Sequence, residues 1–190
     1  MTIILEKGPG GLTMRYLAES MNMTAGALYR YFPTKGQIIG GLGNRSLNRY
    51  AQTIIKGVTA AQQRLQGTDP QTLALHSILV VHEEYINLSI RSYANFRILN
   101  MIMVHPERFM TSEEDYKQFM GNSVKLLSFA GAQMDKAAEV GAMEPGNPTE
   151  RALILVSLMN GSLQLIKFGE EMPELFDNPT VRAKAINSLL

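Results

Sequence analysis

Residues 11–42 read GLTMRYLAESMNMTAGALYRYFPTKGQIIGGL and hold the clearest local signals in the chain. Two short apolar segments each begin at a threonine, a residue that caps helices well, and this predicts helices near 13–21 and 24–31. The turn between them contains Asn22, one of the few residue types that tolerates a positive φ. Ala18 is small where two helices would cross closely. The stretch therefore predicts a helix-turn-helix unit.

The rest of the chain also reads as helix, since no run of alternating β-branched residues bounded by turns appears. Good N-caps precede most of the segments, three of them with proline at the first helical position. The sequence therefore predicts an all-α fold. The further helices are expected near 2–7, 34–66, 69–91, 92–104, 112–140, 147–168 and 178–190.

The second helix of the helix-turn-helix unit suits close approach to a phosphate backbone. Ala25 and Gly26 are small, and glycine in a helix costs about 1 kcal/mol relative to alanine, so Gly26 calls for a reason. Leu28 and Phe32 are expected to face the core. Side chains that can donate hydrogen bonds to phosphates follow later in the helix and at the start of the next one: Tyr29, Arg30, Tyr31 and Lys35.

The run LTMRYLAESMNMTAGALYRYFPTK resembles the DNA-binding module of the TetR family, the tetracycline-repressor-type regulators. The shared features are Ala18, the small-residue helix with Gly26, the run Leu28-Tyr29-Arg30-Tyr31-Phe32, and the Thr34-Lys35 start of the next helix. The resemblance implies a homodimer in which each subunit places residues 24–31 in a major groove of double-stranded operator DNA. It implies phosphate contacts from Thr13, Tyr29, Tyr31 and Lys35, and base reading by Thr24, Ala25, Gly26 and Arg30, with Arg15 a further candidate.

The resemblance also implies two domains, a helix-turn-helix DNA-binding domain over 1–45 and a helical domain for ligand binding and dimerisation over 46–190. The family's first helix has about four turns, whereas only Thr2 to Lys7 precede Gly8 here, so we expect a truncated first helix. Four glycines within residues 36–43 weaken the following helix. They form either a soft link that lets the DNA-binding heads swing or a locally irregular helix without a role.

The body of the chain is rich in methionine and aromatic residues, which suit an adaptable apolar cavity. Plain core packing explains each of them as well. The family places a small-molecule pocket here, and polar or aromatic residues could orient a ligand in it. Our candidates are His82, Tyr85, Phe96, Asn100, Met103, Phe129, Gln133 and Asn160.

The most apolar segment is 147–168, and small residues in it allow another helix to approach closely. By the resemblance it forms a homodimer interface together with 178–190. A central core helix is the other interpretation. Its uncharged stretch has only 15 residues, interrupted by four polar residues and a glycine, fewer than the ~20 apolar residues of a membrane span, so no membrane is expected.

Composition and charge narrow the classes of function. The chain has no cysteine, which excludes disulfides, thiolate zinc sites and cysteine nucleophiles. Residues 1–50 hold six basic and two acidic residues, a net +4, while residues 51–190 hold 12 basic and 15 acidic residues, a net −3. A basic end suggests an anionic partner. No metal-ligand or nucleophile motif is present, so we expect neither an enzyme nor a cofactor. The N-terminus does not have the pattern of a signal peptide, so we expect a cytoplasmic protein.

These observations predict a ligand-responsive transcriptional regulator, a repressor that a small apolar molecule releases from its operator. The alternative is a small-molecule-binding helical dimer whose DNA-binding function is lost or impaired.

Overall fold

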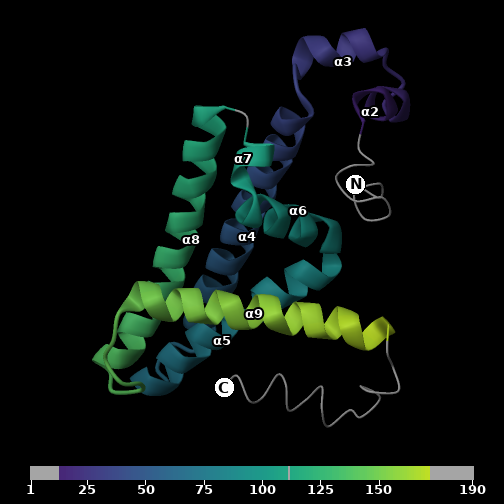
Figure 1. The fold of residues 1–190 in the computed structure, drawn as a ribbon. Helices are drawn as coiled ribbons and strands as arrows, with labels where there is room; N and C mark the ends of the chain where they lie inside the picture. The colour runs from purple at the N-terminus through teal and green to yellow at the C-terminus, as the bar shows by residue number, and fades with distance from the viewer. Residues whose placement is uncertain (1–12, 111, 172–190) are drawn as a thin grey trace. The chain divides into compact units, whose positions relative to one another are not determined.

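The computed structural model describes residues 13–110 and 112–171, and within these ranges the regular structure is entirely helical. The all-α prediction is thus confirmed, as are seven of the predicted helices to within a few residues at each end. Only α7 was not expected. The predicted helices 2–7 and 178–190 lie outside the described residues. The helices are α2 (Met14–Ser20), α3 (Ala25–Tyr31), α4 (Lys35–Arg64), α5 (Pro70–Arg91), α6 (Tyr93–Val104), α7 (Pro106–Phe109), α8 (Glu113–Glu139) and α9 (Pro148–Glu171) (Figure 1).

Side-chain caps fix where most of these helices begin. Thr34 Oγ1 accepts a hydrogen bond from the backbone N–H of Gln37, the spacing that its sequence predicted. The carboxylate of Asp69 accepts from two N–H groups in the first turn of α5, and Asn147 Oδ1 does the same for α9. Ser112 and Asp115 pair reciprocally at the start of α8. Each such cap stabilises its helix by about 1 kcal/mol.

The helices pack into two compact units. Unit 1 comprises residues 13–53 and 91–126, and unit 2 comprises residues 54–90 and 127–171, so far as they are described. The long helices α4, α5 and α8 each contribute to both. The division at residue 45 that the resemblance implies stays a prediction.

Unit 1 contains a small core under the helix-turn-helix segment. Met14, Ala18 and Leu28 are buried there, and Ile38 of α4 packs against them. Ala18 is 1% exposed, as expected at a close helix crossing. Phe32, expected in the core, is instead 39% exposed, because the backbone leaves the helix in an extended conformation at this residue.

Gly40 and Gly43 of α4 are packing residues within unit 1. A Cβ on Gly43 would lie 2.2 Å from Cδ1 of Ile102, and a Cβ on Gly40 would lie 3.2 Å from the carbonyl oxygen of Phe109. α4 continues as one helix through this segment. Close approach of α6 and α7 therefore accounts for Gly40 and Gly43, without an irregular helix.

Unit 2 is held together by α9 crossing α5 and α8 (Figure 1). Tyr85 on α5 donates a 2.7 Å hydrogen bond to Asn160 Oδ1 on α9. Gly131 on α8 lies so close to Pro148 that a Cβ would approach its carbonyl oxygen to 3.0 Å. Met159 and Leu163 bring the buried side of α9 into this unit.

α9 is apolar on its outer side as well. Residues Pro148–Glu170 are long and apolar enough to cross a membrane by length and composition alone, with a mean hydropathy of 1.4, whereas their sequence predicted no span. The core helix of a soluble protein passes the same test, and Tyr85 and Pro148 tie α9 to its neighbours. Only 24% of this segment is buried, so most of its surface is exposed in the described part of the chain.

Candidate functional site

The turn between α2 and α3 has the geometry that Asn22 predicted. Asn22 has φ of 54°, the left-handed region that asparagine tolerates. The N–H of Met23 donates to the carbonyl of Ala18 at 2.8 Å, which closes the turn. Thr13 Oγ1 and Thr24 Oγ1 accept from the third residue of each helix, Tyr16 and Ala27. The two short helices are thus held at a fixed angle by caps, turn and core.

α3 presents a small, open outer surface. Gly26 is exposed, and a Cβ built on it would meet no atom within 4 Å. No contact inside the described chain therefore requires glycine here, unlike at Gly43. Thr24 is exposed beside it, and Ala25 is half-buried. A first helical turn with only small side chains on its outer surface allows another molecule to approach its backbone.

Hydrogen-bond donors surround this open surface. Tyr31 is 72% exposed and Tyr29 is 50% exposed, and Arg30 is exposed between them. Lys35 is half-buried at the start of α4. Donors of these types hold phosphate oxygens, and the nearby helix N-termini favour anions. We call the exposed surface of Thr24, Ala25, Gly26, Tyr29 and Arg30 the α3 face.

Arg15 lies on α2 with its side chain 86% exposed. Its Nε donates to Glu19 Oε1 at 3.0 Å. Such an exposed pair contributes little stability, so the guanidinium is able to exchange this carboxylate for a phosphate or a base edge.

The ligand candidates from the sequence are divided between the two units. Phe96, Asn100 and Met103 belong to unit 1, where Phe96 is buried, Asn100 donates to the carbonyl of Phe96, and Met103 is exposed. The others belong to unit 2. There Tyr85 and Asn160 satisfy each other directly, Phe129 is half-buried, and His82 and Gln133 lie on neighbouring helices.

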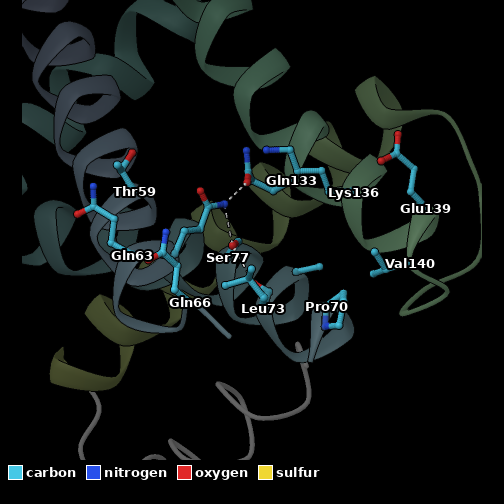
Figure 2. Close-up of a pocket in the computed structure, with 12 residues that line it drawn as sticks. Thr59, Gln63, Gln66, Pro70, Leu73, Ser77, Gln133, Lys136, Glu139 and Val140 are labelled. Carbon is cyan, nitrogen blue, oxygen red and sulfur yellow. Dashed lines mark hydrogen bonds between the residues drawn. The ribbon is translucent and has the colours of Figure 1, made fainter. Parts of the chain in front are cut away.

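Gln133 lies at the floor of a cavity of about 530 Å³ in unit 2, which we call the glutamine pocket (Figure 2). Gln62 Nε2 donates to Gln133 Oε1 at 3.2 Å and to Ser77 Oγ at 3.1 Å. Gln133 and Ser77 in turn donate to carbonyls of their own helices. This network joins α4, α5 and α8, and it gives partners to the Ser77 hydroxyl, to both side-chain polar atoms of Gln133 and to Nε2 of Gln62.

Sequence reasoning missed Gln62 and Ser77. Gln62 lies 71 positions from Gln133, and no local spacing signals a contact over that separation. A buried glutamine is visible in sequence only as a polar residue in an apolar stretch, and that signal selected Gln133 alone.

His82 is half-buried on α5, and its Nε2 is buried without a hydrogen-bond partner. Burial lowers the pKa of His82 below its usual value, while the charge of Glu83 opposes this shift. His82 is therefore neutral near pH 7. Within the described residues, no three histidine or carboxylate side chains gather as a metal site would require.

Comparison with known proteins agrees with this geometry. Residues 1–42 match the sequence profile of the family described as "Bacterial regulatory proteins, tetR family". No curated protein sequence matches the chain.

Two solved structures share the fold of most of the chain. AibR, in complex with isovaleryl coenzyme A and operator DNA, superposes with a TM-score of 0.63 at 18% identity, over 86% of this chain and 80% of AibR. PfmR, a TetR family transcriptional regulator from Thermus thermophilus, gives 0.62 at 18% identity, over 86% and 81%. Apo AibR gives 0.53 at 18% identity, over 83% and 77%. At this identity the likeness shows the fold.

Proposed function

We propose that this chain is a TetR-family regulator and reads double-stranded operator DNA with the α3 face, as its match to the family over residues 1–42 and its fold support. Regulators of this family are non-enzymatic, and the expectation that the chain is not an enzyme agrees with that. The observation that carries the proposal is Gly26, an exposed helical glycine that nothing in the described chain requires. A major groove is wide enough for a helix, and a glycine on the outer surface of that helix lets its backbone approach the base edges closely.

The residues around Gly26 have separate roles in this proposal. Thr13, Tyr29, Tyr31 and Lys35 hold phosphates and fix the register of the protein on the duplex. Base edges are left to Thr24, Ala25 and Gly26, with Arg30 and Arg15 at the sides, where arginine paired to guanine is the commonest specific contact. Residues 1–45 then form the DNA-binding domain, and residues 46–190 the domain for effector and dimer.

A homodimer is supported by the outer side of α9. Five of its exposed residues recur at alternating spacings of four and three, and none of these five is charged: Ile154, Leu158, Gly161, Leu165 and Phe168. Ile154 is 59% exposed and Phe168 is 49% exposed. An apolar stripe at this spacing typically packs against another helix. We propose that this α9 stripe packs against a second copy of the chain, together with residues 178–190.

We further propose that the regulator is a cytoplasmic repressor, not bound to a membrane, that a small apolar molecule releases from DNA. The structure of AibR holds both isovaleryl coenzyme A and operator DNA, so this fold combines the two partners in at least one protein. An effector shifts such a protein only by its difference in affinity between the DNA-competent form and the other form.

Selection of bound duplexes from a random DNA pool tests the proposal. With the purified chain in moderate salt, we expect enrichment of a palindrome whose half-sites lie about one helical turn or more apart, because a two-fold dimer presents two α3 helices. Absence of any enriched sequence would refute the proposal and favour the alternative, a ligand-binding helical dimer without DNA function.

A further inference from the structure

Unit 2 contains a second cavity, of about 580 Å³, between α5, the end of α8 and α9. Its walls are almost entirely apolar and include Leu75, Leu79, Met134, Met143, Ile154 and Leu158. Arg151, in the first turn of α9, contributes the one charged side chain among the described residues that line it. We call this cavity the Arg151 pocket.

The guanidinium of Arg151 is incompletely satisfied. One terminal nitrogen donates to the carbonyl oxygen of Glu144, but the other, Nη1, is buried without a hydrogen-bond partner. No carboxylate in the described part of the chain forms an ion pair with Arg151. A buried donor of a charged group is costly when it is left unpaired, so an acceptor that reached the guanidinium would stabilise it.

The chain also makes room for this side chain. A Cβ on Gly146 would lie 2.7 Å from two guanidinium nitrogens of Arg151. Any other residue at this position would displace the guanidinium. Gly146 thus lets Arg151 lie across the connection between α8 and α9, at the edge of the apolar cavity.

We propose that the Arg151 pocket binds an amphiphilic carboxylate, with its hydrocarbon body against the apolar walls and its carboxylate on the guanidinium of Arg151. Guanidinium and carboxylate match in planar geometry, and such charge-assisted bonds are about twice as strong as neutral ones. A volume of this size is typical of small-molecule sites. We also identify this carboxylate as the effector, and that part of the inference rests on the proposed function.

The glutamine pocket is the weaker site for an effector. Its floor is polar, but the network of Gln62, Ser77 and Gln133 leaves those groups with partners inside the chain. The Arg151 pocket offers both an apolar surface and an unpartnered donor.

The position of the Arg151 pocket suggests how its ligand acts. Ile154 and Leu158 line the pocket and also belong to the α9 stripe proposed to contact the second subunit. A hydrocarbon chain packed against them changes the surface that the partner meets. Ligand binding is thereby coupled to the arrangement of the two subunits, and through it to the spacing of the α3 helices.

Calorimetric titration of the full chain with decanoate, below its micellar concentration, tests the site without DNA. We expect decanoate to bind at least about 10-fold more tightly than the neutral decanol, and Arg151→Gln to remove this preference. Arg108→Gln, which alters an exposed arginine outside the pocket, should leave it unchanged. Equal affinity for decanoate and decanol in the unsubstituted chain would overturn the proposal, even if Arg151→Gln failed to fold. A preference for decanoate that survived in folded Arg151→Gln would overturn it as well.

The same ligand added to the chain on its selected duplex separates this inference from the proposed function. Release of the duplex by decanoate, lost in Arg151→Gln, supports both. Arg151-dependent binding of decanoate without any release would refute the effector role and leave the pocket assignment standing. Failure to bind decanoate in a chain that still selects a palindrome would overturn the pocket alone.

Discussion

Replacement of Gly26 by leucine tests whether the α3 face reads DNA or only supports the fold. A Cβ at this position meets no atom within 4 Å, so the free protein accommodates the side chain. Leucine is a better helix former than glycine by up to about 0.8 kcal/mol, less in a first turn, so thermal stability should hold or rise slightly. In the complex, however, the side chain would stand between α3 and the groove floor.

The expected loss of affinity follows from two subunits. If each leucine prevents one base contact worth about 1.4 kcal/mol, the dimer loses about 2.8 kcal/mol, or roughly 100-fold in Kd. Fluorescence anisotropy with the selected duplex measures this loss. Gly121→Leu is the matched control, since Gly121 is another exposed helical glycine with nothing within 4 Å of its Cβ position. Unchanged affinity in Gly26→Leu would refute the placement of α3 in the groove.

Three further predictions concern phosphate contacts, packing and protonation. Tyr29→Phe combined with Lys35→Ala should weaken binding to all duplexes alike. It should also flatten the slope of the logarithm of the binding constant against the logarithm of the salt concentration, by about 1 per lost phosphate contact. An unchanged slope would contradict these roles. Gly43→Ala should lower the free energy of unfolding by about 1–3 kcal/mol, because the new Cβ would lie 2.2 Å from Cδ1 of the buried Ile102. A melting temperature equal to that of the unsubstituted chain would contradict this and show that the contact relaxes freely. Burial holds the pKa of His82 in the folded protein below its value in the unfolded chain, so the unfolded chain binds more protons as the pH falls through ~6.5. Acidification should therefore destabilise the protein, and it should do so less in His82→Gln. Identical pH dependence of the two melting temperatures would contradict this.

Local signals made most of the fold predictable. Thr34, Asp69 and Asn147 cap the helices that their positions predicted, and Asn22 has the positive φ expected of it. In each case the interaction joins residues within four positions of one another, so the sequence displays it directly. α7 escaped prediction because its four residues are too few to show a helical period.

The α3 face was predictable for the same reason, whereas the cavities were not. The α3 face lies on one short helix, so adjacent residues in sequence are neighbours on it. The cavities bring together residues from three helices, and their character depends on which polar groups remain unpaired. Gln133 was visible in sequence as a polar residue in an apolar stretch, but its partner Gln62 was not. Arg151 looked like an ordinary charge in the first turn of a helix, and only packing shows that one of its nitrogens is buried and unpartnered.

The glycines of α4 illustrate how composition alone misleads. Four glycines in eight residues suggest a weak helix, yet at Gly40 and Gly43 the helix α4 lies in close contact with its neighbours. Gly26, by contrast, has no internal contact. The two kinds of glycine cannot be told apart in the sequence. The atoms around each Cβ position distinguish a glycine that packs inside the protein from one that is exposed.

Tethered cleavage of DNA from the α3 end of the protein tests the central claim most directly. The chain has no cysteine, so Tyr31→Cys provides a unique attachment point for an iron chelate beside the α3 face, and Gly121→Cys provides one on α8. On the selected duplex, we expect the Tyr31→Cys conjugate to cut at two symmetric positions, one in each half-site, and the Gly121→Cys conjugate to leave these positions intact. A Tyr31→Cys conjugate that bound the duplex without cutting either half-site would contradict the claim that α3 reads the operator.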